Sequence, residues 1–270
     1  MGRLFAVVVS LIALISAAIF ALHTWWLPVD ISTHGSRIDR QLNETMIVAG
    51  ILFVAAQLAL AAFVWRFGER GGTRATWPIK VFPGGATPMV VIATVLVGIE
   101  ILVLTFVGSK VWASVYQSEA APGALQIDVL AEQFAFYFRY AGADGKFGVI
   151  HPEKMSDADQ NFFGLDPASD TTARDDIVVA TLVIPADQPV ALRLHTKDVG
   201  HSFYVREVRI QQDFVPGMVI PLHFTATTPG KYELVCTQLC GLGHYNMRAY
   251  VEVKSPTDFA QWLKEQAPAF

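Results

Sequence analysis

Hydrophobic residues follow two different patterns along the chain. In residues 1–116 they form three long runs, at residues 4–22, 46–64 and 88–107, and the one charged residue inside these runs is Glu100. A helix needs about 20 apolar residues to cross the hydrocarbon core of a bilayer. We therefore predict that residues 1–116 form transmembrane helices at about residues 4–24, 45–65 and 88–110.

From about residue 125 the hydrophobic runs become short, and several of them alternate with polar positions. These segments are rich in Val, Ile, Phe and Tyr, a composition typical of β-strands. Turn signals such as Pro216-Gly217 and Pro229-Gly230 separate them. The predicted strands lie at residues 126–140, 145–150, 177–184, 190–195, 203–209, 218–225, 231–236 and 247–253. Many short strands with almost no helix predict a β-sandwich or β-barrel domain over residues 117–254.

Two segments depart from the strand pattern. Residues 151–176 are polar and rich in Asp, so we interpret them as a surface insertion in the β domain. Residues 255–270 begin with Ser255 and Pro256, ahead of an apolar-periodic stretch. Ser is a favoured N-cap and Pro a favoured first helical residue, so a short C-terminal helix is predicted there.

The composition favours a membrane-anchored protein, and the two parts of the chain differ in net charge. Hydrophobic residues make up 53% of the chain, above the roughly 45–50% of ordinary soluble domains. Residues 1–116 contain eight basic and five acidic residues, whereas residues 117–270 contain twelve and nineteen. A net acidic domain argues against binding to nucleic acid and favours a basic partner.

The charges between the helices predict the orientation in the membrane. The loop between the second and third runs contains Arg66, Arg70, Arg74 and Lys80 against a single acid, Glu69, whereas the loop between the first and second runs is balanced. Positive loops tend to stay in the cytoplasm. The β domain is therefore predicted to lie on the outer side.

The first run has an alternative interpretation as a cleaved signal peptide. Arg3 at its start and the small residues Ala17 and Ala18 allow it. The apolar stretch is longer than the roughly 7–15 residues of a signal-peptide core, so a retained helix is favoured. The β domain lies outside in both cases.

Glu100, inside the third run, has two interpretations. One is a carboxyl group that packs against a partner helix and is held neutral or hydrogen-bonded. The other is a group that takes up or relays protons while it faces a larger membrane subunit. Acidic residues inside membranes are rare and usually turn away from lipid, so both interpretations place Glu100 against protein.

Two thiols, an imidazole and a thioether fall within twelve residues, in the segment Cys236-Thr-Gln-Leu-Cys240-Gly-Leu-Gly-His244-Tyr-Asn-Met247. Soft sulfur and imidazole donors together favour copper or zinc over hard cations. A further strong ligand has to come from elsewhere in the chain. His201, which follows a turn-like segment and opens a strand, is the best candidate.

Three other interpretations of this segment stay open at this point. Outside the cytoplasm, two cysteines commonly form a disulfide, which explains neither His244 nor Met247. Zinc sites usually combine Cys and His without Met. A mononuclear blue-copper site needs one Cys, two His and an axial Met, which leaves one Cys over.

The Cys-x3-Cys-x3-His-x2-Met arrangement resembles the dinuclear copper (CuA) loop of cytochrome c oxidase subunit II. The flanking sequence resembles that family too, at Asp198-Val-Gly-His201-Ser-Phe, Arg209-Ile-Gln-Gln-Asp213-Phe-Val-Pro216-Gly217-Met218 and Gln133-Phe-Ala-Phe-Tyr-Phe-Arg-Tyr140. The resemblance covers residues 125–254 and two membrane helices before them.

This resemblance implies a membrane-anchored, all-β protein, in which a cupredoxin-like Greek-key β-barrel follows the transmembrane helices. It also implies six copper ligands: two bridging thiolates, one imidazole on each ion, and two weak axial donors. The resemblance assigns the bridging thiolates to Cys236 and Cys240 and the imidazoles to His201 and His244. It assigns the weak axial donors to Met247 and the backbone carbonyl of Gln238.

Three departures from the family pattern change what is expected. The family usually has Glu at the position of Gln238, where its side chain helps to bind magnesium, and an amide is a poorer ligand for a hard cation. This argues against magnesium here. Phe134 and Phe136 stand where the family has tryptophans, so they are the candidates for electron transfer from the donor. The family's acid just before the last helix has no clear counterpart, and Glu100 lies inside the helix instead.

The electron donor is expected to be a separate protein such as cytochrome c. The chain lacks the Cys-x-x-Cys-His motif that attaches haem c covalently. Acidic residues that either dock a basic donor or simply form a solvated surface are Asp198, Glu207, Asp213 and Glu233.

We therefore expect subunit II of a haem–copper terminal oxidase, in a bacterial-type inner membrane with its C-terminal domain on the periplasmic side. Electrons from the donor would pass through the copper centre to haem in subunit I, within a complex of several oxidase subunits. Oxygen reduction, coupled to proton pumping, would take place in that other subunit. One alternative is the same module in a nitric oxide reductase. Others are a membrane-tethered copper carrier or assembly protein, and a structural domain with a disulfide.

Overall fold

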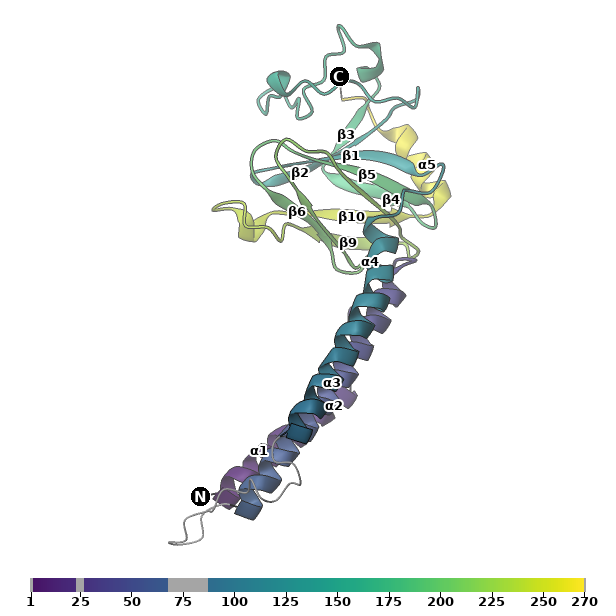
Figure 1. Cartoon of the computed structure of the whole chain (residues 1–270). Helices are drawn as coiled ribbons and strands as arrows, with labels where there is room; N and C mark the ends of the chain where they lie inside the picture. The colour runs from purple at the N-terminus through teal and green to yellow at the C-terminus, as the bar shows by residue number, and fades with distance from the viewer. Residues whose placement is uncertain (1, 23–26, 68–86, 270) are drawn as a thin grey trace. The chain divides into compact units, whose positions relative to one another are not determined.

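The computed structural model describes residues 2–22, 27–67 and 87–269 (Figure 1). These residues form two compact units. The first contains Met1–Leu27 and Arg37–Trp112, and the second contains Pro28–Ser36 and Ala113–Phe270. Four charged residues on which the orientation prediction depends, Glu69, Arg70, Arg74 and Lys80, lie outside the described residues.

Long apolar helices make up the first unit. They are α1 (Gly2–Leu22), α2 (Gly35–Phe67) and a continuous helical span from Thr87 to Tyr116. This span comprises α3 (Thr87–Val103), a π-helical turn (Leu104–Gly108) and α4 (Ser109–Tyr116). Each of the three is long and apolar enough to cross a membrane, which confirms the three predicted helices.

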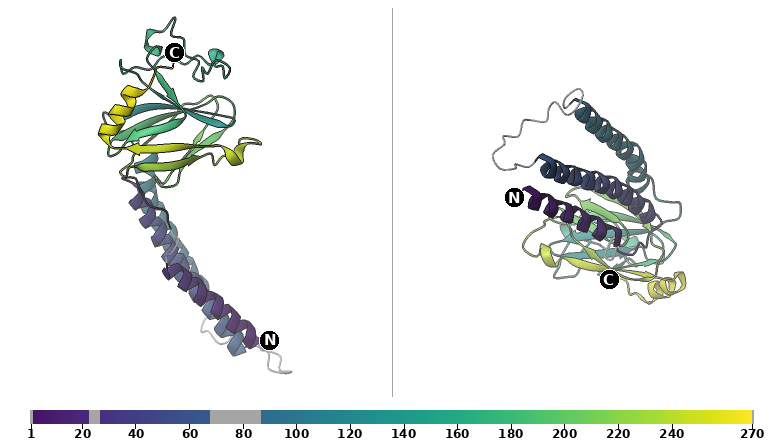
Figure 2. Two further views of the ribbon diagram at one scale, coloured as in Figure 1. Left: turned by 180° about the vertical axis from the view of Figure 1, so that it is seen from behind. Right: turned by 90° about the horizontal axis from the view of Figure 1, so that it is seen from below.

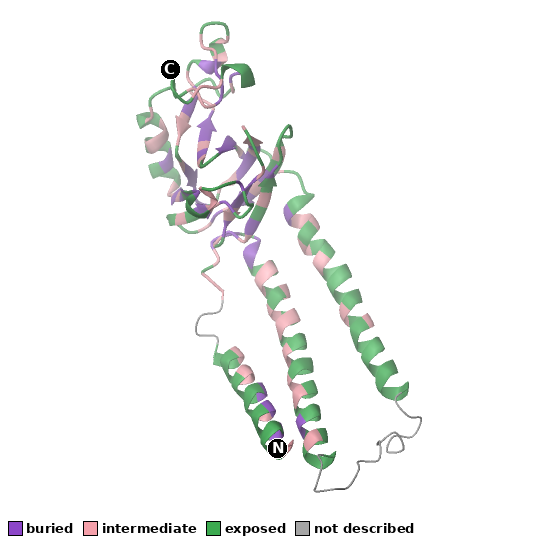
Figure 3. Cartoon of the chain, turned by 90° about the vertical axis from the view of Figure 1, so that its left-hand side faces the viewer, coloured by how far each residue is buried: buried purple, intermediate pink, exposed green. Residues whose placement is uncertain are grey.

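Small residues let α1 approach α2 closely. Ala6 and Val9 of α1 are buried against Ala61 of α2, because small side chains allow helices to pack tightly in lipid. Figure 2 shows α1 alongside α2 in the view from below. By contrast, α3 contains no buried residue, and Figure 3 shows its surface almost wholly exposed.

Ten strands form the second unit. In chain order they are β1 (Leu125–Glu132), β2 (Ala135–Tyr140), β3 (Ile177–Val179), β4 (Thr181–Pro185), β5 (Pro189–Thr196), β6 (His201–Val205), β7 (Ile210–Phe214), β8 (Ile220–Thr225), β9 (Gly230–Val235) and β10 (Arg248–Lys254). They pair into two five-stranded sheets, of order β3-β2-β1-β5-β8 and β4-β10-β9-β6-β7. The pairs β1–β5 and β4–β10 are parallel, and the other pairs are antiparallel.

The two sheets pack face to face around an aromatic core. The ring of Phe136 on β2 lies 6.0 Å from that of Phe214 on β7, and Phe203 on β6 lies 6.4 Å from Phe224 on β8. The buried Tyr140 hydroxyl donates a 2.8 Å hydrogen bond across the sandwich to the Val183 carbonyl. The all-β expectation for this domain is thus confirmed.

Three predicted strands differ in the structure. Residues 126–140 form a hairpin, β1 and β2, because a turn at residues 133–134 pairs Glu132 with Ala135. Residues 177–184 divide into β3 and β4, which belong to different sheets. Residues 145–150 form no strand. Their backbone groups bond to side chains instead: the amides of Gly148 and Val149 donate to Asp176 and Asp170.

The polar segment 151–176 contributes to a second, smaller core. Phe163, Leu165 and Ala173 from this segment are buried with Leu130 of β1. Leu130 faces away from the sandwich interior, since its neighbours Val129 and Ala131 point into the main core and side chains alternate along a strand. The segment therefore covers the outer face of this sheet.

Arg139 of β2 ties this covering segment to the sheet. The arginine is 1% exposed and pairs with two buried carboxylates, Asp128 of β1 and Asp176. Its Nη1 also donates to the Gly148 carbonyl at 2.8 Å. Burial opposes ionisation of Asp128, but the hydrogen bond from His195 and the charge of Arg139 outweigh it and lower the pKa of that carboxyl to about 2.

The segment before α2 belongs to the β unit. The Ile31 amide donates to the Glu207 carbonyl at 3.1 Å, the Thr227 amide donates to the Ile31 carbonyl at 2.7 Å, and the Ile31 side chain is fully buried. At the other end of the chain, α5 (Pro256–Glu265) begins at its Ser255 cap and packs Trp262 against Tyr140. Both segments therefore complete the domain that carries the candidate site.

Candidate metal centre

The β9–β10 connection brings most of the candidate ligands together. Cys236 follows β9, Met247 precedes β10, and Cys240 and His244 lie in the loop between them. The Cys236 amide donates to the Met247 carbonyl at 3.1 Å and closes the base of the loop. Because β9 and β10 are antiparallel neighbours, residues that are eleven apart in sequence meet at the same end of the sheet.

His201 reaches the same place from a different part of the chain. It is the first residue of β6, which lies next to β9 in the sheet. Its side chain is fully buried, and its Nδ1 lies 3.9 Å from the Cys236 Sγ. One donor atom from each of His201, Cys236 and Cys240 lies within 4.8 Å of the other two. Sheet pairing thus supplies the ligand that the loop lacks.

The candidate donor atoms form two groups around the thiols. The two Sγ atoms are 3.9 Å apart. The Gln238 carbonyl oxygen lies 3.1 Å from the Cys236 Sγ, on the same thiol as His201. The other thiol, Cys240, has the His244 Nδ1 at 3.6 Å and the Met247 Sδ at 3.7 Å. Each thiol therefore has one imidazole and one weak donor beside it.

Burial separates the three sulfur donors from solvent. Cys236, Cys240 and Met247 are 7%, 4% and 2% exposed. Burial, with the neighbouring Cys236 thiol, raises the pKa of the Cys240 thiol to about 11. A compact set of sulfur and imidazole donors with no carboxylate among them fits copper or zinc rather than magnesium or calcium.

Asp198 holds His201 in position. Its Oδ1 lies 2.8 Å from the His201 Nε2, and its Oδ2 accepts a 2.8 Å hydrogen bond from the Gln133 amide. Burial opposes ionisation of Asp198, but these hydrogen bonds lower the pKa of its carboxyl. With Nε2 engaged in this way, the Nδ1 of His201 faces the thiols. The structure therefore places Asp198 beside the donors rather than free on the surface.

Gln133 and Phe134, in the turn between β1 and β2, hold the loop from the other side. The Gln133 side-chain amide donates to the Cys240 carbonyl. The Phe134 ring lies so close to Gly243 that a Cβ added there would stand 2.5 Å from the ring. Gly241 is in a left-handed conformation, with φ of +137°, and also borders this turn. The loop therefore needs glycine at both positions.

The predicted donor-docking residues differ in their exposure. Phe136 is 2% exposed in the core, which corrects its assignment as a contact for the donor: β2 turns it inward, whereas Phe134 in the preceding turn is 39% exposed. Glu207 is half-buried and pairs with Arg206. Asp213 on β7 is exposed. Glu233 lies 3.5 Å from Arg248.

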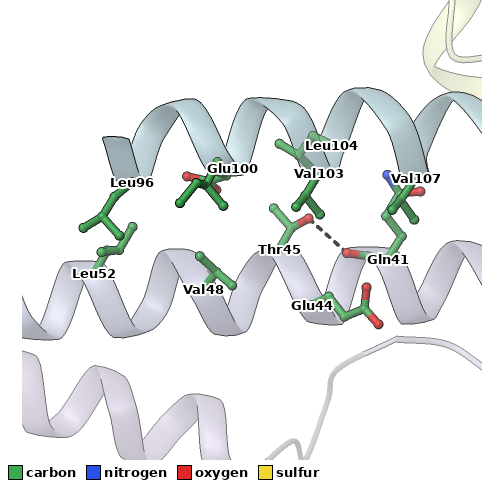
Figure 4. A pocket seen from close by; sticks show the side chains of 11 residues that line it. Gln41, Glu44, Thr45, Val48, Leu52, Leu96, Glu100, Val103, Leu104 and Val107 are labelled. Atoms are coloured by element: carbon green, nitrogen blue, oxygen red, sulfur yellow. Dashed lines mark hydrogen bonds between the residues drawn. The ribbon is translucent and has the colours of Figure 1, made fainter. Parts of the chain in front are cut away.

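Glu100 belongs to the helical unit. It lies on α3 beside a groove that α3 forms with α2 (Figure 4).

Sequence reasoning missed the part that Gln133 plays in holding the loop, because this residue precedes Cys240 by 107 positions and no local motif marks it. The spacing Asp-x-x-His is the signal in the sequence that marks Asp198 as a partner of His201.

The chain is similar to known subunits II of cytochrome c oxidases. The family model for the periplasmic domain of cytochrome c oxidase subunit II matches residues 165–254. The chain is 32% identical to the alternative cytochrome c oxidase subunit 2 of Bradyrhizobium diazoefficiens, over 97% of this chain and 91% of that one. It is 26% identical to the cytochrome c oxidase subunit 2 of Cereibacter sphaeroides, over 82% and 72%.

A solved structure is similar over the β domain. The crystal structure of the periplasmic domain of cytochrome oxidase subunit II of Bradyrhizobium japonicum matches with a TM-score of 0.39 and 22% identity. The match covers 54% of this chain and 94% of that structure.

Proposed function

The chain belongs to the cytochrome c oxidase subunit II family, and from that premise we propose that it is the subunit through which electrons enter a haem–copper oxidase. It contributes no bond chemistry of its own. Electrons arrive one at a time from a donor outside the membrane and leave for haem in the catalytic subunit. Reduction of oxygen and proton pumping belong to the rest of the complex.

The observation that carries this proposal is the pair of buried thiols, each with one imidazole and one weak donor. In this assignment Cys236 and Cys240 would hold two copper ions together with one imidazole for each ion, from His201 and His244. Met247 and the Gln238 carbonyl would be weaker donors, which tune the reduction potential of such centres. When bound, the two copper ions supply a carrier for a single electron.

The protein's own contribution is to keep the donors still. His201 is fixed by Asp198 on one side and by its place at the start of β6 on the other. The base of the loop is closed by the Cys236–Met247 hydrogen bond, and Gln133 holds its middle at Cys240. Donors that are already in place need little rearrangement when the charge of the centre changes, and contacts around the ligands commonly set metal affinity.

For the outer partner we propose a soluble donor such as cytochrome c. Phe134 lies beside the loop that carries Cys240 and His244 and is partly exposed, so it is the better candidate for the donor contact. Asp213 on β7 is exposed, and its negative charge would attract a basic protein. Asp198 and Glu207 are engaged within the domain and have a weaker claim.

For the location we propose a bacterial inner membrane, with the β domain on the periplasmic side. The description of the matching family model supports this side. The segment Pro28–Ser36 belongs to the same compact unit as the domain, so the first connection lies on the domain's side. The N-terminus of α1 and the end of α2 then lie on the cytoplasmic side, as the basic residues after α2 predict.

The test is the copper content and the electron paramagnetic resonance spectrum of the purified protein. We expect two coppers per chain and a seven-line hyperfine pattern, because one unpaired electron shared by two equivalent copper nuclei of spin 3/2 splits into seven lines. A single copper with a four-line pattern, or no copper with both thiols oxidised, would contradict the proposal. A Cys240→Ser variant should lose the seven-line signal, since it removes one of the two thiols that would hold the copper ions.

A further inference from the structure

Glu100 lies deep in the apolar span and has no partner within the described part of the chain. It follows Thr87 by 13 residues and precedes Tyr116 by 16. At 1.5 Å per residue this places it about 20 Å from either end, near the middle of a hydrocarbon core about 30 Å thick. Among the residues that the structure describes, none donates a hydrogen bond to its carboxyl group or forms an ion pair with it.

The carboxyl group borders an apolar groove between α2 and α3. The groove has a volume of about 190 Å³. Figure 4 shows Glu100 across from Val48, between the Leu52–Leu96 pair and the residues Thr45 and Val103. Apart from the carboxyl group and the Thr45 hydroxyl, these side chains are aliphatic.

The other polar groups of the groove are directed elsewhere. The Thr45 hydroxyl donates to the Gln41 carbonyl at 3.0 Å. The Gln41 amide lies against Gly108, where an added Cβ would stand 2.5 Å from its Nε2. Glu44 points away from α3 in Figure 4. None of the three therefore satisfies Glu100.

Neither lipid nor water is suited to hydrogen-bond the Glu100 carboxyl group in this groove. Acyl chains can cover the valines and leucines of α3, but they cannot hydrogen-bond a carboxyl group, and an ionisable side chain at this depth is costly. Lipid headgroups lie at the membrane surface, too far away. A buried water needs two to four polar partners, and beside Glu100 the groove offers only Thr45, whose hydroxyl already donates to the Gln41 carbonyl.

We propose that this groove receives a side chain with a hydrogen-bond donor from a transmembrane helix of a second subunit. The donor is a hydroxyl, amide or basic group, and it pairs with Glu100. The absence of any buried residue on α3 agrees with this, because a helix with a polar group at mid-membrane and no covering in its own chain is completed by another helix. That the second subunit is the oxidase's catalytic subunit rests on the proposed function.

The experiment uses the whole complex, isolated from membranes in mild detergent. Glu100→Leu and Glu100→Gln are compared with Glu44→Gln, a matched change in the same groove whose carboxyl points away from α3. For Glu100→Leu we expect about tenfold less catalytic subunit retained per chain, since the partner's donor is left unpaired. Glu100→Gln should retain an intermediate amount, because an amide still accepts a hydrogen bond. Glu44→Gln should behave like the unchanged chain.

Two further measurements separate the outcomes. The amount of chain inserted in the membrane should be equal or higher for Glu100→Leu, whereas a merely structural role for Glu100 would lower it. A photo-reactive residue in place of Val103 should attach to a membrane-embedded peptide of another subunit. Unchanged retention in Glu100→Leu, or attachment to lipid alone, would overturn the proposal. Copper content, measured on the same samples, reports on the proposed function independently.

Discussion

At the scale of single residues, the candidate centre depends on neighbours that are distant in sequence. His201 is oriented by Asp198, and Asp198 accepts a hydrogen bond from the Gln133 amide. The side chain of the same glutamine donates to the Cys240 carbonyl. Gln133 therefore connects the two stretches that carry the candidate ligands. Such outer contacts commonly change metal affinity about 10- to 100-fold when they are removed.

A change of Gln133→Ala tests this connection. We expect copper affinity to fall about tenfold, because the loop loses its side-chain contact at Cys240. Competition with a copper chelator measures the affinity, and the optical spectrum and reduction potential report the geometry of the bound metal. The matched control is Gln126→Ala, since Gln126 lies on β1, the strand that leads to Gln133, and its side-chain amide also donates to a backbone carbonyl, that of Ala124. Equal affinities in both variants would contradict the role of Gln133.

At the scale of elements, the connection between β2 and β3 is held by charge as well as by packing. Arg139 lies between Asp128 and Asp176, and all three are buried. Burial raises the pKa of Asp176 to about 6 in spite of the Gly148 amide and Arg139. A buried ion pair is a weak source of net stability, but removing one partner is costly because a charge is left unpaired.

The variant Arg139→Met is therefore expected to lower the free energy of unfolding of the β domain by about 3–5 kcal/mol. The carboxylates of Asp128 and Asp176 lose their cation, and the β2–β3 connection loses the hydrogen bond from Arg139 to the Gly148 carbonyl. Denaturant unfolding of the full chain in detergent, followed by tryptophan fluorescence, measures the change. Arg193→Met is the control, because Arg193 also pairs with Asp128 but its side chain is 42% exposed. A loss in Arg193→Met as large as in Arg139→Met would contradict this account.

At the scale of the whole molecule, chain connectivity limits the topology in the membrane. The segment Pro28–Ser36 belongs to the β unit, and α2 and the span Thr87–Tyr116 both connect to that unit at one end. With the proposed location in a membrane, two apolar helices that connect to the same unit are expected to form a hairpin. We therefore predict that the far end of α2, at Arg66, is exposed on the side of the membrane opposite to the domain.

Cysteine labelling in intact cells tests this topology. With a membrane-impermeant maleimide, Ser36→Cys and Asp144→Cys should both react from outside. Arg66→Cys, in the last turn of α2, should react only after the membrane is opened. The unchanged chain is the control for labelling of Cys236 and Cys240, which are buried. Reaction of Ser36→Cys and Asp144→Cys from opposite sides would contradict the assignment of residues 28–36 to the β unit.

The sequence alone determined the features that depend on neighbouring residues. Runs of apolar residues specify the three long helices, because a helix that crosses lipid satisfies all its backbone hydrogen bonds within one segment. The strands β5, β6, β8, β9 and β10, the Ser255 cap and the Cys236–Met247 loop are local in the same sense. The loop needs only its two flanking strands to bring four donors together.

Tertiary structure alone decided the features that join distant segments. Sheet register turned Phe136 into the core and left Phe134 against the loop. It also aligned Arg139 with Asp128 across β1 and β2, and it placed Gln133 between Asp198 and Cys240. These contacts span between 11 and 109 positions in sequence. A shift of one residue in strand pairing would reverse every side chain's face, so no local pattern can specify them, and only the packed sandwich does.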